Sequence, residues 1–377
     1  MNFVGVKPKK TIFFPDRLYE TRYTGEIWGK HFEKSKVFNI FSNEKSDLYS
    51  TECLGVIHSQ KPEVIPNDSL TGWWEEESLQ FRFDGEEYAC QNYNLVQNIF
   101  SRNTGILETG VLQNKCAFIL GCGSVGSLVA LELARAGIGK YILVDNDILE
   151  YHNLCRHQCS IVEVGEYKVD ALKHRILEIN PAAEIEAIVS TVEMLDKPVF
   201  DSFCKKDQTV LIGCADNRSA DVYANSISVM YGIPFLSIGF WERAFAGEIF
   251  YYLPNKGMPC YKCALGEGNS MSQRTSTNRR LYTNEEDLSK VNFEPGISVD
   301  INFVTTVGIK LLLDIFNLDN EGYTPRLLPT LTQYTLVCNT NNPKIGGEMA
   351  EIFSYPLQVT TSLQVGHGLN CPPCEFE

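Results

Sequence analysis

The chain has 377 residues, of which 44% are hydrophobic and 21% are charged, a composition typical of folded globular proteins. Its 47 acidic and 33 basic side chains give a formal net charge of −14, which argues against sequence-independent binding to nucleic acid or an anionic membrane. No apolar run approaches the roughly 20 residues of a membrane-spanning helix, and residues 1–10 lack the apolar segment of a signal peptide. We therefore expect a soluble, cytoplasmic protein with two domains, or one large domain and a smaller appendage.

Residues 1–95 carry Lys- and Glu-rich turns and three of the four tryptophans, two of which, Trp73 and Trp74, precede an acidic stretch. No helical or strand period is sustained in this segment, which we predict to be a small α+β appendage. Paired tryptophans beside carboxylates suit half-buried packing better than an exposed docking surface. Recruitment of a partner protein remains the functional hypothesis for this segment.

From Lys115 onward, apolar strands alternate with amphipathic helices, which predicts an α/β domain over residues 96–377. The expected elements are strands at 116–120, 141–144, 209–213, 233–238, 247–252, 333–338 and 351–357, and helices at 127–136, 168–179 and 299–316. This order predicts a doubly wound, mostly parallel sheet with helices on both faces. The polar residues within 264–298, rich in Ser, Thr, Asn and Arg, predict a mobile crossover loop.

A glycine-rich turn stands between the first strand and the first helix of this domain. Gly121, Gly123 and Gly126 follow the order Gly-x-Gly-x-x-Gly, which lets the backbone approach a phosphate at a helix N-terminus. Asp145, at the end of the second strand, is placed to bond the ribose hydroxyls of either NAD or ATP. The turn therefore predicts a nucleotide without identifying it.

The polar residues that follow distinguish between the two nucleotides. Asp147, Asn153, Arg156 and Lys168 come after the second strand, and Asp216 follows a later one. Hydride transfer has no need of these groups, whereas Arg and Lys neutralise the oxygens of a triphosphate and a carboxylate at a strand end can hold Mg²⁺. The pattern predicts ATP and Mg²⁺.

In this order the motifs resemble those of the ThiF/MoeB/HesA family, adenylyltransferases related to ubiquitin-activating enzymes, over about residues 98–374. The resemblance implies a Rossmann-like adenylation domain, usually in a homodimer or pseudo-dimer. Its reaction uses MgATP to convert the C-terminal carboxylate of a ubiquitin-like protein or peptide into an acyl-adenylate.

The resemblance also implies roles for individual residues. The nucleotide would be bound by Gly121, Gly123 and Gly126, its ribose by Asp145, its phosphates by Asp147, Asn153, Arg156 and Lys168, and Mg²⁺ by Asp216. Arg102, in a Ser-Arg-Asn sequence, would reach in trans into the ATP site of the neighbouring subunit. Arg156, Lys168, Asp216 and Arg102 are thus the expected catalytic residues. His157 replaces the family's usual Gln, and because imidazole can also donate a hydrogen bond we expect altered rather than lost binding.

Two Cys-x-x-Cys knuckles, Cys260 with Cys263 and Cys371 with Cys374, form a second motif. Four thiolates make a closed, structural Zn²⁺ site, which would pin the C-terminal tail to the core. A redox pair and unligated thiols are the competing interpretations, and two knuckles in a cytosolic chain favour zinc. Most other cysteines stand singly in apolar segments, which indicates reduced thiols.

The fate of the acyl group is open. No cysteine lies between Ala264 and Val337, so the crossover loop cannot form the thioester that many family members form. Either the acyl-adenylate is the final enzyme-bound product, or a loop hydroxyl accepts the acyl group as an ester, and a polar loop without this role is the favoured interpretation. The candidate hydroxyls are those of Ser270, Ser272, Thr275, Ser276 and Thr277.

The sequence therefore predicts a homodimeric adenylyltransferase that activates a ubiquitin-like carrier protein, as the first step of a bacterial-type conjugation pathway with a conjugating enzyme as a further partner. The appendage would recruit the carrier or that enzyme. The alternatives are a peptide-modifying (MccB-like) adenylyltransferase, a sulphur-carrier activator, a dinucleotide-dependent oxidoreductase, and a catalytically inactive zinc-stapled scaffold.

Overall fold

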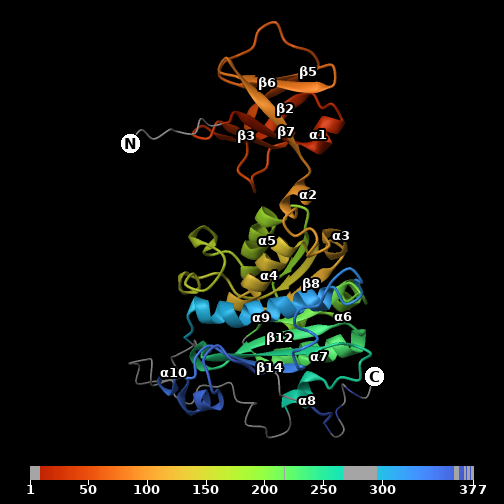
Figure 1. Cartoon of the computed structure of the whole chain (residues 1–377), viewed down its shortest axis with the longest axis vertical. Helices are drawn as coiled ribbons and strands as arrows, with labels where there is room; N and C mark the ends of the chain where they lie inside the picture. The colour runs from red at the N-terminus through yellow and green to blue at the C-terminus, as the bar shows by residue number, and fades with distance from the viewer. Residues whose placement is uncertain are drawn as a thin grey trace. The chain divides into compact units, whose positions relative to one another are not determined.

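The computed structural model describes residues 9–215, 217–265, 295–360, 365–368, 371 and 374. The chain divides into two units, residues 1–102 and 103–377 (Figure 1). None of the helices in the described part of the chain is long and apolar enough to cross a membrane.

The first unit is a closed barrel of seven strands in the order β1-β3-β2-β4-β5-β6-β7. Its elements are β1 (Thr11–Pro15), α1 (Asp16–Glu20), β2 (Gly25–Phe32), β3 (Val37–Ser42), β4 (Glu52–His58), β5 (Leu70–Glu75), β6 (Ser78–Phe83), β7 (Glu86–Tyr93) and α2 (Leu95–Ile99). This fold is more regular than the expected α+β appendage. The sequence lacks the two-residue alternation of apolar and polar side chains that indicates strands, because β2 has register shifts around Trp28 and β5 is buried at five of its six positions.

The paired tryptophans of β5 pack within this first unit. Trp73 and Trp74 are 5% and 6% exposed, and Trp74 Nε1 donates a hydrogen bond to the backbone oxygen of Tyr23 at 3.0 Å. The Arg22 guanidinium lies 5.1 Å from the centre of the Trp74 ring. The packing interpretation of these residues is confirmed.

The second unit is built on an eight-stranded sheet in the order β10-β9-β8-β11-β12-β13-β14-β15. Its strands are β8 (Cys116–Leu120), β9 (Lys140–Val144), β10 (Glu184–Ile188), β11 (Thr209–Gly213), β12 (Phe235–Phe240), β13 (Ala246–Tyr252), β14 (Tyr334–Cys338) and β15 (Val359–Thr360). The first five strands in that order run parallel, and the last three are added antiparallel. The expected α/β class with a mostly parallel sheet is confirmed.

Helices cover both faces of this sheet (Figure 1). One apolar core lies under α4 (Ser124–Ala136), α5 (Lys168–Ile179) and α9 (Ser298–Phe316), and the other under α6 (Lys197–Phe203) and α7 (Arg218–Tyr231). Shorter helical segments are α3 (Thr109–Leu112), η1 (Tyr151–Asn153), η2 (Ile161–Glu163), η3 (Val192–Met194), η4 (Glu242–Ala244), α8 (Tyr261–Leu265), α10 (Pro343–Gly346) and η8 (Gly347–Ile352). The sheet is therefore buried on both sides, as its apolar strands require.

The strand expected at 351–357 is wrong. Residues up to Ile352 belong to η8, and the edge strand β15 begins only at Val359. Pro356 has no N–H to donate to a strand pair, and Leu357 adopts a left-handed conformation with φ of 56°. These two residues place a turn where the apolar pattern suggested a strand.

A buried carboxylate anchors the segment that follows α9. Asp314 is fully buried and accepts hydrogen bonds from the Tyr323 hydroxyl at 2.7 Å and from the backbone N–H groups of Leu327 and Leu328 at 2.6 and 2.9 Å. These bonds compensate the burial of the charge, so Asp314 has a structural role in this segment.

Candidate active site

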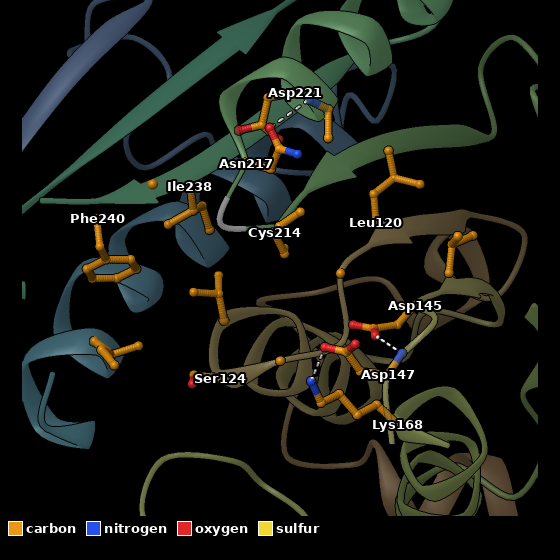
Figure 2. Close-up of a pocket in the computed structure, with 18 of the residues that line it drawn as sticks. Leu120, Ser124, Asp145, Asp147, Lys168, Cys214, Asn217, Asp221, Ile238 and Phe240 are labelled. Carbon is orange, nitrogen blue, oxygen red and sulfur yellow. Dashed lines mark hydrogen bonds and ion pairs between the residues drawn. The ribbon is translucent and has the colours of Figure 1, made fainter. Parts of the chain in front are cut away.

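A cavity of about 990 Å³ lies at the carboxyl ends of strands β8, β9, β11 and β12 (Figure 2). From β8 the chain continues to β9 and β10 on one side and then crosses to β11 on the other side, so the strand order reverses at β8. Open α/β sheets bind ligands at such a switch point, because the loops after the two neighbouring strands diverge there.

The glycine-rich turn forms one wall of the cavity and leads into α4. Gly121 has φ of 89°, and a Cβ on it would lie 2.8 Å from the backbone nitrogen of Ala215. A Cβ on Gly126 would lie 1.9 Å from the Gly121 oxygen. Gly123 is different, since no atom of the described residues beyond its own stretch of chain lies within 4 Å of the Cβ that it would carry. Two of the three glycines are thus required by the fold, while Gly123 leaves free space in the cavity.

Two side chains hold the turn in place at the Cys122 backbone. The Cys122 N–H donates to Asp145 Oδ2 at 2.7 Å, and His157 Nε2 lies 2.7 Å from the Cys122 oxygen. The Cys159 N–H donates to His157 Nδ1 at 3.1 Å, so the neutral ring carries its proton on Nε2 and donates it to Cys122. His157 does donate a hydrogen bond, as the sequence suggested, but the acceptor is the backbone of the turn.

We expect protein stability to fall below about pH 6.5 because of His157. Burial lowers the pKa of this ring from its ordinary value of 6.5, so in that range the unfolded chain binds a proton that the folded chain does not. The contribution of His157 is therefore intact above its unfolded pKa and is lost as the pH falls. The midpoint of thermal unfolding should fall as the pH is lowered from about 7.5 to 5.5, both in the wild type and in the exposed-site control His174→Gln. If the midpoint of His157→Gln falls by the same amount, another group is responsible for the loss of stability.

A buried lysine and an aspartate form an ion pair beside the glycine-rich turn. Lys168 Nζ lies 2.8 Å from Asp147 Oδ2, and the Lys168 side chain is 11% exposed (Figure 2). The Asp147 N–H donates to Asp145 Oδ1 at 2.9 Å, which orders the segment after β9. Arg156 and Asn153 line the same cavity, and Asn153 Oδ1 accepts the Glu150 N–H at 2.9 Å. The structure thus brings these sequence-predicted residues together around one cavity.

Other predicted residues cannot be compared with this geometry. Asp216 and the loop hydroxyls of residues 270–277 lie outside the described residues. Arg102 is an exposed residue at the end of the first unit. Asn217, which follows Asp216, caps α7 by accepting the N–H groups of Ser219 and Ala220 at 2.9 and 3.4 Å.

A buried ion pair that the sequence did not predict adjoins the lining of the cavity. Glu248 on β13 is 1% exposed, and Arg218 Nη2 lies 2.9 Å from both of its carboxylate oxygens. Trp241 Nε1 and the Tyr334 hydroxyl donate to Glu248 Oε2 at 2.8 and 2.7 Å, and the Tyr261 hydroxyl donates to Oε1 at 3.4 Å. Arg218 and Trp241 also line the cavity. Their positions in the wall are therefore set by one buried carboxylate.

The four knuckle cysteines meet in a candidate metal centre. Their Sγ atoms all lie within 4.8 Å of one another, and the separations are 3.7 Å for Cys260–Cys263, 3.3 Å for Cys260–Cys371 and 3.6 Å for Cys263–Cys374. A tetrahedral zinc site with Zn–S bonds of about 2.3 Å requires sulfur atoms about 3.8 Å apart. Both the donor set and its dimensions fit a Zn²⁺ ion.

A profile described as the ThiF family matches residues 97–346, about two thirds of the chain. The chain belongs to the ThiF family. The family resemblance inferred from the motifs is confirmed, although Cys371 and Cys374 lie beyond the matched residues.

This ThiF-family chain is similar to several named proteins. It is 26% identical over 234 residues to ubiquitin-like modifier-activating enzyme 5 of Caenorhabditis briggsae, covering 58% of this chain and 52% of that protein. It is 30% identical over 168 residues to the adenylyltransferase and sulfurtransferase UBA4 of Kluyveromyces lactis, covering 44% and 36%. The chain thus spans about half the length, or less, of these two curated relatives. The crystal structure of E. coli MccB has the same fold, with a TM-score of 0.53 and 20% identity over 74% of this chain and 73% of that chain.

Proposed function

We propose that this ThiF-family chain is an ATP-dependent adenylyltransferase that activates the C-terminal carboxylate of a ubiquitin-like protein, in the first step of a bacterial-type conjugation pathway. The observation that carries this proposal is the cavity at the switch point, where the glycine-rich turn faces Lys168 and Arg156. A phosphate-binding turn next to two basic side chains suits a triphosphate better than a nicotinamide dinucleotide. The similarity to a modifier-activating enzyme and to an adenylyltransferase supports the same activity.

The nucleotide would lie along the turn and the N-terminus of α4. The first N–H groups of α4 lack partners within their own helix and carry a partial positive charge, which favours an anion. Each Asp145 oxygen accepts one backbone N–H and keeps a further lone pair, which can accept a ribose hydroxyl. Asp145 would then both order the turn and bind the sugar.

Gly123→Ala is expected to weaken nucleotide binding without destabilising the fold. Residue 123 has φ of −75°, outside the left-handed region that favours glycine, and its Cβ would project into open space where we place the phosphates. A methyl group there should weaken ATP binding by about tenfold, an amount typical of one misplaced contact. Isothermal titration calorimetry and thermal unfolding measure the two properties separately.

Gly126→Ala is the matched comparison, since its Cβ would clash with the Gly121 oxygen. This variant should lose folding stability by several kcal/mol, on the order of other severe backbone clashes. Wild-type ATP affinity in a stable Gly123→Ala protein would contradict the proposed nucleotide position.

In the proposed reaction an oxygen of the substrate carboxylate attacks the α-phosphorus of ATP. The bond from that phosphorus to the bridging oxygen of the β-phosphate breaks, and pyrophosphate leaves with the electron pair. Lys168 and Arg156 would neutralise the charge that moves onto pyrophosphate, and the ion pair with Asp147 orients the lysine. No group of the chain becomes covalently attached in this step.

Two metal ions belong to the proposal. Asp216 would hold Mg²⁺, whose preferred ligands are carboxylate and phosphate oxygens, and a bound Mg²⁺ would neutralise phosphate charge. The four cysteines would hold a structural Zn²⁺ that ties the tail to the segment after β13.

The carrier-protein and peptide-substrate alternatives are separated by ATP–pyrophosphate exchange. Exchange stimulated by a folded ubiquitin-like protein with a free C-terminus supports the proposal. Stimulation by a short peptide instead supports the MccB-like alternative, which the shared fold with MccB favours. If neither stimulates exchange and the chain binds no nucleotide at all, the inactive scaffold is the remaining interpretation. As a control, a carrier whose C-terminal carboxylate is amidated should not stimulate exchange.

We also propose a homodimer in which Arg102 acts in trans. Exposed apolar side chains follow β9 in the second unit, with Tyr151, Ile161 and Val162 exposed by 71%, 66% and 84%. Apolar side chains gathered in one surface segment are typical of a protein contact.

The first unit would recruit the carrier or a conjugating enzyme. The acyl-adenylate would be the final enzyme-bound product, or a hydroxyl of the crossover loop 264–298, in which no cysteine is present, would accept the acyl group as an ester and release AMP.

A further inference from the structure

The network around Glu248 connects two sites of the second unit that lie on different segments. Two of its members, Arg218 and Trp241, line the cavity. A third, Tyr261, stands between Cys260 and Cys263 in the first knuckle. One carboxylate therefore contacts both the cavity wall and the knuckle that carries two of the four thiols.

Helix α7 provides a second connection between the same two sites. Arg218 is its first residue, and Asn225 lies seven residues later, about two turns along and on the same face. Asn225 Oδ1 accepts the backbone N–H of Tyr261 at 2.7 Å. The knuckle is thus bonded to α7 through its backbone and to Glu248 through the Tyr261 hydroxyl.

The chemistry of this network makes it sensitive to the loss of one member. Arg218, Trp241, Tyr261 and Tyr334 each donate to the Glu248 carboxylate. Burial raises the pKa of Tyr334, which keeps its hydroxyl protonated. In a buried network each hydrogen bond polarises the others, and a charge that loses a donor reorients toward those that remain. A displacement of Tyr261 should therefore change the positions of Arg218 and Trp241.

We propose that Glu248 is a positioning residue for the cavity wall, and that through Tyr261 it makes the positions of Arg218 and Trp241 depend on metal occupancy of the four-cysteine site. The metal site then acts on nucleotide binding as well as on the tail. The identity of the ligand in the cavity and the metal at the four cysteines rest on the proposed function.

The first test compares Glu248→Gln with a second buried carboxylate. An amide offers one acceptor oxygen to four donors, so its NH₂ group must face at least one of them. We expect the KM for ATP in pyrophosphate exchange to rise about tenfold with kcat within about twofold, a coupling typical of members of one network. Asp314→Asn, which removes a buried charge away from the cavity lining, should lower thermal stability and leave the KM unchanged. A wild-type KM in Glu248→Gln overturns the positioning role.

The second test reads the cavity wall without turnover. Trp241 is the only tryptophan of the second unit, since the other three, Trp28, Trp73 and Trp74, belong to the first. In the full chain labelled with 5-fluorotryptophan and loaded with Zn²⁺, the ¹⁹F resonance of Trp241 is assigned with Trp241→Phe. Removal of the metal with 1,10-phenanthroline should shift this resonance and leave the other three in place.

Tyr261→Phe isolates the connection itself. It removes the hydroxyl that reaches Glu248 and leaves the four thiols and the Tyr261 backbone N–H, so the variant should retain one Zn²⁺ per chain. We expect its Trp241 resonance to respond much less to metal removal. A Trp241 resonance that is unchanged by metal removal from the wild type, or that responds equally in Tyr261→Phe, overturns the proposed connection. This readout stands even if the chain fails to catalyse exchange, which would refute the proposed function alone.

Discussion

Lys168→Met should reduce carrier-stimulated ATP–pyrophosphate exchange by about 10²- to 10³-fold, the loss typical of one preorganised charge-stabilising group. The Lys168 side chain is 11% exposed, its ammonium group is paired with Asp147, and the residue lines the cavity. The removed charge is therefore close to where charge would develop on pyrophosphate. Methionine keeps most of the length and apolar surface of the side chain. The loss should therefore appear in activity, with little change in thermal unfolding.

Lys173→Met, on the same helix but outside the cavity lining, is the matched control and should retain wild-type exchange. Comparable exchange in Lys168→Met and wild type would remove the main support for a triphosphate in this cavity. Equal losses in both variants would point to helix α5 as a whole rather than to the charge.

Cys260→Ser should abolish metal binding at the four-cysteine site and destabilise the second unit. Cys260 is 1% exposed and has two thiols within 3.7 Å, so no water can replace its sulfur without rearrangement. Loss of a structural metal is expected to lower the free energy of unfolding by on the order of 4 kcal/mol. Elemental analysis should find about one zinc per wild-type chain and none in the variant.

The control for this experiment is Cys53→Ser, which changes an exposed thiol of the first unit. It should retain both the zinc content and the unfolding midpoint of the wild type. One zinc per chain in Cys260→Ser, or none in the wild type, would refute the proposed zinc site.

Local patterns made the parallel half of the sheet and the cysteine cluster predictable. The glycine spacing fixes a strand, a turn and a helix within 21 residues, Cys116–Ala136, and that unit is present as expected. Two Cys-x-x-Cys pairs restrict the tertiary fold by themselves, because reduced thiols gather chiefly where a metal can bind them. In both cases the residue types and their spacing were sufficient for the prediction.

The Glu248 network could not be predicted in the same way, because its members come from α7, β13, α8, β14 and the residue that precedes η4. One signal was available, since Glu248 is the only charged residue among the seven of the fully buried strand β13. A buried acid requires a partner, but the sequence alone could not identify Arg218 as that partner. The barrel of the first unit was missed for a related reason, because its bulges and the five consecutive buried residues of β5 break the two-residue alternation.

The peptide groups on either side of Cys122 are fixed at both ends, the N–H by Asp145 and the carbonyl by His157. A loop held in this way loses its conformational freedom during folding, so ligand binding costs little further conformational entropy. Association at this turn should accordingly proceed in a single step whose rate increases linearly with nucleotide concentration. Any slow rearrangement would then originate elsewhere in the molecule.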